Sequence, residues 1–279
     1  MLASPFMSLL PQSLEHTVPV LHLFGGPFVT LGERRVDIPE GSKRLLVFCA
    51  LHRGGVDRRY AAGLLWPDVT DSRAAGNLRS ALWRLRRADI QLMYAGKYTL
   101  SLRDDVLLDV EFVTSWATRL IDGSASCDDL SLIPWSIEKH VLLPGWYEDW
   151  VLSERERVTQ RLLRGLEVQS RQLLQQGRPA EAVEAAMVAT RADPLRESAQ
   201  QALVEAYLAE GNHAEAHRRF KIFRDLLGHE LGIEPSPQLS ALVSGQFNRP
   251  IEKHSYLHGM SSVENTRHGQ ANSGRLDRL

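Results

Sequence analysis

Short apolar stretches bounded by turn residues lie near the beginning of the chain. The turn signals Gly25-Gly26-Pro27 and Gly32-Glu33 separate three of them, namely Val20–Phe24, Phe28–Leu31 and Arg35–Ile38. Apolar and β-branched residues in short runs between glycine and proline are typical of strands joined by tight turns. The pattern therefore predicts a small antiparallel sheet.

Helical periodicity follows in three successive segments. They are predicted to run from Ser42 to about Arg53, from Asp57 to Trp66, and from Asp71 or Ser72 to about Arg87. Each segment starts at a residue that can cap a helix, and Gly54-Gly55 and Pro67 end the first two. Residues 91–94 and 98–102 flank a turn and predict a hairpin. Three helices followed by a hairpin form the order of a winged helix-turn-helix.

The rest of the chain is predicted to be helical and contains a repeat. The sequence Gly177–Ala182 returns 34 residues later as Gly211–Ala216, after predicted helices at 163–176 and 196–210. This period is that of tetratricopeptide repeats, in which helix pairs stack and bury each other's small residues. The segment Leu231–Pro237 is predicted to end the array.

These patterns predict a mainly α protein with a small β component. An N-terminal winged helix-turn-helix is followed by an α-helical domain that resembles tetratricopeptide repeats. The expected divisions are a flexible lead-in over 1–19, a DNA-binding domain over 20–104, a helical domain over 105–247 and a disordered tail over 248–279.

Charge is distributed unevenly along the chain. The whole chain has a net charge of -1, yet the segment 43–103 carries 12 basic residues against four acidic ones. The rest is therefore acidic, with a net charge of -9. A strongly basic segment beside an acidic remainder suggests a module that binds a polyanion, joined to a part with another task.

The third predicted helix concentrates the candidate chemistry. Leu78, Leu82 and Leu85 fall on its apolar side, and the opposite side is predicted to carry Arg73, Asn77, Ser80, Arg84 and Arg87, with Arg79, Trp83 and Arg86 flanking them. In a DNA major groove, Arg can bind guanine and Asn can bind adenine through two hydrogen bonds. Phosphate contacts are expected from Lys43, Arg44 and Lys97. The alternative interpretation is a solvated basic face.

Several motifs resemble known families. Gly41–Leu46, Leu64–Asp68 and Asn77–Arg87 resemble the OmpR-type winged helix, whereas Leu142–Val151, the Ala-Glu-Ala repeats and Leu231–Pro237 resemble the bacterial transcriptional activator domain. Together they resemble a small member of the Streptomyces antibiotic regulatory protein family, over about residues 20–247. Two positions depart from the OmpR pattern, because Val-Asp-Val-His is here Leu78–Ala81 and the wing end Gly-Tyr-Arg is here Lys97–Thr99.

The resemblance implies an activator that binds direct repeats in double-stranded promoter DNA, often for secondary-metabolite (antibiotic) gene clusters. It implies a base contact from Arg84 and a loop at 66–71 that contacts the sigma or alpha subunit of RNA polymerase. The helical domain is expected to mediate protein–protein packing and a homodimer on DNA. Asp68 and Asp71 are the candidate polymerase contacts, although Asp71 can instead act only as a helix cap.

Other classes of protein find little support in the sequence. Fewer than about 20 residues precede the sheet, too few for a receiver domain, and Gly96-Lys97 lacks the glycine and Ser or Thr of a phosphate-binding loop. No catalytic constellation, cofactor motif or metal-ligand spacing is present, including at Cys49, Cys127, His254, His258 and His268. The remaining alternative is a helical-repeat scaffold that binds protein and touches DNA weakly.

The cellular location of the protein is predicted from the length of its apolar runs. The longest, Leu45–Leu51, is far shorter than the roughly 20 residues that cross a bilayer, so no membrane segment is expected. The first ten residues lack the basic stretch and cleavage site of a secretory signal. A cytoplasmic, nucleoid-associated protein is therefore expected.

Overall fold

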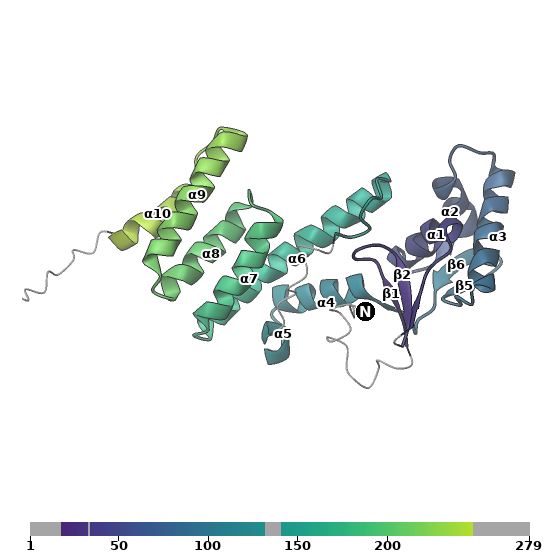
Figure 1. The fold of residues 1–279 in the computed structure, drawn as a ribbon, viewed down its shortest axis with the longest axis horizontal. Coiled ribbons are helices and arrows are strands. Elements are labelled where there is room, and N and C mark those ends of the chain that lie inside the picture. The colour runs from purple at the N-terminus through teal and green to yellow at the C-terminus, as the bar shows by residue number, and fades with distance from the viewer. Residues whose placement is uncertain (1–17, 33, 132–140, 248–279) are drawn as a thin grey trace, which may run out of the picture.

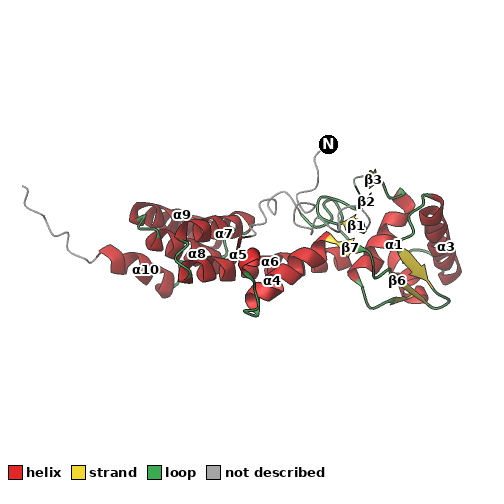
Figure 2. Cartoon of the chain, turned by 90° about the horizontal axis from the view of Figure 1, so that it is seen from below, coloured by secondary structure: helices red, strands yellow, loops and turns green. Residues whose placement is uncertain are grey.

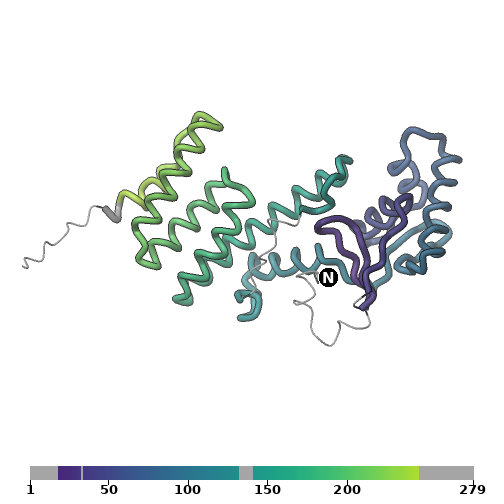
Figure 3. Tube along the Cα trace, in the orientation of Figure 1, coloured from purple at the N-terminus to yellow at the C-terminus, as the bar shows by residue number. Residues whose placement is uncertain are grey.

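The computed structural model describes residues 18–32, 34–131 and 141–247. Almost all of the predicted lead-in and the whole predicted tail, with its three histidines, lie outside the described residues. Two small sheets and three helices form one end of the molecule, and an array of helices extends from them toward the other end (Figure 1). The chain passes along this length from N- to C-terminal residues (Figure 3). The predicted fold class is confirmed.

The first sheet contains the three predicted strands and one more. Strands β1 (Pro19–His22), β2 (Phe28–Leu31) and β3 (Arg34–Val36) pair antiparallel, in register Leu21 with Val29 and Thr30 with Arg35. A short strand that was not predicted, β7 (Leu107–Leu108), pairs in parallel with β1. The order β3-β2-β1-β7 therefore ties the start of the chain to the residues that enter the helical array.

The winged helix-turn-helix follows in the predicted order. Its helices are α1 (Glu40–Leu51), α2 (Arg58–Leu65) and α3 (Asp71–Arg87). Strands β4 (Val56–Asp57), β5 (Met93–Ala95) and β6 (Thr99–Leu102) form a second sheet in the order β4-β6-β5, whose β5–β6 hairpin is the wing. The three helices and β6 share one apolar cluster, which includes Leu45, Phe48, Leu65, Leu78 and Leu100.

Two of the three predicted caps are wrong. Ser42 lies inside α1, where it is buried and its hydroxyl donates to the Ala81 carbonyl at 2.8 Å, while Pro39 precedes the helix. Thr70 precedes α3, so Asp71 is the first residue of that helix. The cap at Asp57 is confirmed, because its carboxylate accepts the amide hydrogens of Arg59 and Tyr60.

Seven helices form the described part of the array (Figure 2). They are α4 (Asp109–Ile121), α5 (Cys127–Ser131), α6 (Asp149–Gln175), α7 (Pro179–Ala192), α8 (Glu197–Ala209), α9 (His213–Leu231) and α10 (Pro237–Phe247). Gly177 and Gly211 occupy equivalent turns with positive φ angles of 71° and 82°, and Ala182 and Ala216 are buried as the repeat requires. The array does not end at Pro237, since α10 packs against α8 and α9.

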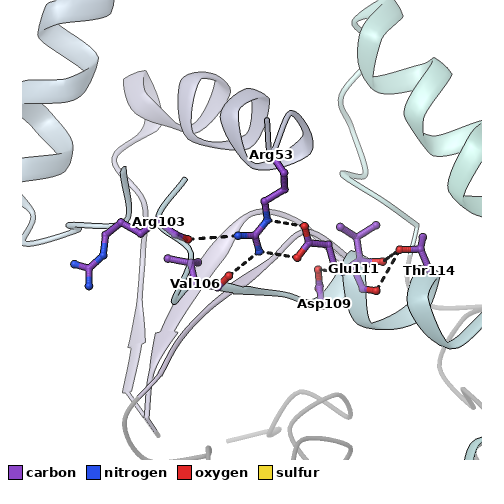
Figure 4. Close-up of polar contacts among 7 residues, drawn as sticks. Arg53, Arg103, Val106, Asp109, Glu111 and Thr114 are labelled. Carbon is purple, nitrogen blue, oxygen red and sulfur yellow. Dashed lines mark hydrogen bonds and ion pairs between the residues drawn. The ribbon is translucent and has the colours of Figure 1, made fainter. Parts of the chain in front are cut away.

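A second, larger apolar cluster joins the two ends of the described molecule. One cluster of buried side chains extends from Leu21 in β1 to Val243 in α10. Polar contacts reinforce the junction: the Arg53 guanidinium donates to both carboxylate oxygens of Glu111 and to the Val106 carbonyl (Figure 4). The Phe48 and Trp150 rings also meet edge to face at 5.3 Å. The winged helix is therefore packed directly against the helical array.

Candidate nucleic-acid interface

Helix α3 has a well-defined buried face. Its buried side chains are Ala74, Leu78, Ala81, Leu82 and Leu85, which recur with helical spacing and pack against α1 and α2. The three leucines predicted for this face are therefore placed correctly. The opposite face is left to solvent.

The middle of the exposed face differs from the predicted stripe. Gly76, Ser80, Trp83 and Arg87 recur at i, i+4, i+7 and i+11 opposite the buried face. Gly76 and Asn77 are both half-buried. The Arg84 Nη1 atom lies 2.7 Å from the position that a Cβ atom on Gly41 would take. The predicted stripe therefore lies toward one side of the exposed face, next to the start of α1.

Eight cations of the basic segment have no carboxylate partner within the described parts of the chain. They are Arg58 and Arg59 at the start of α2, Arg73, Arg79, Arg84, Arg86 and Arg87 on α3, and Lys97 at the tip of the wing. All but the half-buried Arg58 are exposed. Because no internal anion neutralises them, their positive potential is directed to solvent on one side of the winged helix.

The other four cations of the segment form ion pairs. Lys43 pairs with Glu40, Arg44 with Glu148 at 2.9 Å, Arg53 with Glu111, and Arg103 with Asp105. The hydrogen bond from Arg103 lowers the pKa of Asp105. Of the three residues predicted to bind phosphate, Lys43 and Arg44 thus already pair with carboxylates. Lys97 has no carboxylate partner among the described residues, and its ammonium lies 5.1 Å from the centre of the Tyr98 ring.

A groove joins α2, α3 and the wing. It encloses about 620 Å³ and is lined by Arg58, Arg59, Asp71, Ser72, Arg79, Lys97 and Tyr98, among others. The Arg58 guanidinium donates to the Gly96 carbonyl at 2.8 Å, which holds the wing against the start of α2. Four cations against one carboxylate give this groove a basic lining.

Sequence reasoning missed Arg58 and Arg59 as candidate site residues. They directly follow the helix cap Asp57, and their backbone amides donate to the Tyr98 carbonyl and the Asp57 carboxylate, so only their side-chain charges are available to an anion. The sequence signal that could have identified both residues is a helix start with a capping residue inside the basic segment. Their approach to Lys97, which is distant in sequence, follows from the pairing of β4 with β6 and from the hydrogen bond between Arg58 and the wing.

The two candidate polymerase contacts lie in different surroundings. Asp68 is exposed in the turn between α2 and α3. Asp71, in contrast, begins α3 and lines the basic groove. Neither forms an ion pair with another described residue.

The remaining candidate chemistry is limited. Burial raises the pKa of Cys49 to about 12, so this thiol stays protonated, and Cys127 is exposed as a free thiol. Among the described residues, no three His, Cys, Asp or Glu side chains gather where they could hold a metal ion. None of the described helices combines the length and apolar character needed to span a membrane.

Comparisons with known proteins match both halves of the molecule. The family model described as the bacterial transcriptional activator domain matches residues 139–244. The chain is 30% identical over 215 residues to the regulatory protein AfsR of Streptomyces griseus, covering 72% of this chain and 22% of AfsR. It is 29% identical over 189 residues to AfsR of Streptomyces coelicolor, covering 64% of this chain and 19% of that relative. The chain thus spans about a fifth of the length of these relatives.

A solved structure has a similar fold. EmbR of Mycobacterium tuberculosis, in complex with a low-affinity phosphopeptide, superposes with a TM-score of 0.65. The match covers 82% of this chain and 65% of the EmbR chain at 20% sequence identity. At this identity the likeness concerns the fold alone.

Proposed function

The chain belongs to the Streptomyces antibiotic regulatory protein family of transcriptional regulators, and from this premise we propose that it is a sequence-specific activator of a secondary-metabolite gene cluster. It binds direct repeats in promoter DNA as two copies and contacts RNA polymerase. It acts in the cytoplasm, on the nucleoid.

The distribution of unpaired cations supports DNA as the ligand. Within the basic segment 43–103, four cations pair with carboxylates, whereas the eight around α3, the start of α2 and the wing do not. These eight cations gain no stabilisation from internal ion pairs, and their mutual repulsion opposes folding. Phosphate groups of a duplex supply the missing anions, and release of their counterions favours binding.

Within this face, the side chains divide into two roles. The helix α3 enters the major groove, where Arg73, Asn77, Arg79, Ser80, Trp83, Arg84, Arg86 and Arg87 lie within reach of base edges or phosphates. The basic groove receives the phosphate backbone between α3 and the wing, held by Arg58, Arg59, Arg79 and Lys97. Lys43 and Arg44 contribute only if DNA displaces their carboxylate partners.

Salt dependence of binding tests the phosphate role of the groove. The triple variant Arg59→Ala, Arg79→Ala, Lys97→Ala should reduce the slope of log K against log salt by about three units, one per phosphate contact. The matched control Arg164→Ala, Arg171→Ala, Lys221→Ala removes the same charge from exposed positions of the helical array and should leave the slope nearly unchanged. Equal slopes in both variants would exclude the groove from the interface.

Transcription from a purified system tests the polymerase contact. Asp68→Ala should keep DNA affinity and lower transcript yield, because Asp68 is exposed and lies outside the groove. Full transcription at saturating protein would exclude Asp68. Equal affinity of the parent protein for every duplex sequence would instead favour the helical-repeat scaffold.

A further inference from the structure

Trp83 is an exposed aromatic side chain in the middle of the solvent face of α3. Its relative exposure is 58%, although every other large apolar side chain of this helix is buried. It contributes to neither apolar cluster of the molecule. Its indole therefore does not serve the packing of the fold, and it presents apolar surface to whatever covers α3.

The neighbours of Trp83 on the same face shape what it can contact. Arg87 places its guanidinium 5.2 Å from the centre of the Trp83 ring, a cation–π contact that covers one side of the indole. Toward the N-terminus of the helix the same face carries the small residues Ser80 and Gly76. Helical side chains lean toward the N-terminus, so the free part of the indole lies over the Ser80 turn. Trp83 is thus an apolar side chain that projects beside two small residues. Over those residues another molecule can come close to the α3 backbone.

A DNA major groove offers one apolar feature, the 5-methyl group of thymine. We propose, resting on the DNA-binding function proposed above, that the Trp83 indole packs against a thymine methyl and makes one position of the binding site specific for thymine. Arg87, held against the ring, contacts the adjacent phosphate or base edge. The indole and the methyl group both leave water when they meet, and this contact is lost at any base pair that lacks a methyl group.

The test deletes the methyl group from the DNA. A duplex is first recovered from a random library with the purified full chain, and its thymines are then replaced by deoxyuridine one at a time. For the parent protein, one replacement should weaken binding about fourfold, the effect of about one buried methyl group. For Trp83→Ala the same replacement should have no effect.

Two controls separate this contact from general damage. Tyr94→Ala removes an equally exposed aromatic side chain from the wing, at 59% exposure, and should retain the fourfold methyl effect. The melting temperature of Trp83→Ala should equal that of the parent, because the indole is outside both apolar clusters.

The outcomes distinguish this inference from the function on which it rests. If no deoxyuridine replacement weakens the parent, or if Trp83→Ala keeps the methyl effect, the thymine contact is overturned while sequence-specific binding stands. If the parent binds the recovered duplex no more tightly than random duplexes, the proposed function itself fails.

Discussion

At the scale of single residues, a buried polar pair lies where the first sheet meets the helical array. His22 Nδ1 is 3.8 Å from an Asp109 carboxylate oxygen, and both side chains are fully buried. Burial, assisted by the charge of Arg35, lowers the pKa of His22 to about 4. Burial raises the pKa of Asp109 to about 7, against the opposing effect of amide hydrogens donated by Leu23 and Phe24.

The two shifts act on stability in opposite directions. As pH falls from 7 to 4, folded Asp109 takes up a proton before its unfolded form does, so this residue stabilises the fold progressively. Over a similar range, below 6.5, unfolded His22 takes up a proton before its folded form does, so this residue destabilises the fold. The two contributions largely cancel in the parent protein.

Replacing one member of the pair should expose the contribution of the other. In His22→Gln, the free energy of unfolding should rise, relative to the parent, as pH falls from 7 to 5. In Asp109→Asn it should fall over the same interval. Urea unfolding at both pH values measures the change, and parallel pH profiles for both variants and the parent would contradict the assigned pKa shifts.

At the scale of elements, Gly76 is a costly residue in the middle of α3. A Cβ atom there would meet nothing closer than Arg79 Nη2 at 3.7 Å, an ordinary contact, so packing does not require glycine. Glycine within a helix costs about 1 kcal/mol relative to alanine. Under the proposed function, glycine at this position would let the α3 backbone come close to base edges.

The variant Gly76→Ala should therefore separate stability from function. The free energy of unfolding should increase by about 1 kcal/mol, while affinity for the recovered duplex should decrease. Chemical denaturation and a binding titration on the same preparation provide both values. An increase in both stability and affinity would show that the helix does not approach the bases at Gly76.

The sequence predicted the elements better than the contacts between them. The buried face of α3 followed from periodicity, and Asp57 followed from local capping chemistry. Ser42 was misplaced because its hydroxyl is used by the Ala81 carbonyl of another helix. The strand β7 has two residues, too few for a periodic signal.

The same limit applies to the candidate site. The pairing of Arg44 with Glu148 joins two distant parts of the chain, and no local pattern distinguishes Arg44 from a free cation. The groove between Arg59 and Lys97 likewise forms only when α2 and the wing come together. Local chemistry was therefore predictable, and tertiary pairing was not.

At the scale of the whole molecule, Arg53 connects the winged helix to the helical array. It lies just beyond α1 and binds Glu111 of α4 and the carbonyls of Val106 and Arg103 (Figure 4). Its side chain is 32% exposed, so these charge-assisted hydrogen bonds are partly shielded from water. The contact fixes the position of α4 relative to α1.

The variant Arg53→Ala should lower the free energy of unfolding by about 1–3 kcal/mol, because three acceptor groups lose a charged donor. The control Arg224→Ala breaks a more exposed ion pair with Asp225 and should change the free energy of unfolding by less than about 1 kcal/mol. Urea unfolding of the full chain measures both variants. If both variants lose the same small amount of unfolding free energy, Arg53 does not stabilise the junction between the winged helix and the helical array.

The central claim is that the unpaired cations of the winged helix serve sequence-specific recognition of DNA. The most direct measurement is the ratio of dissociation constants of the purified full chain for random duplexes and for the duplex recovered from a library, at physiological salt. We expect a ratio of about a thousand or more, the usual margin of specific over non-specific binding. A ratio near one, with binding abolished by salt, would contradict it.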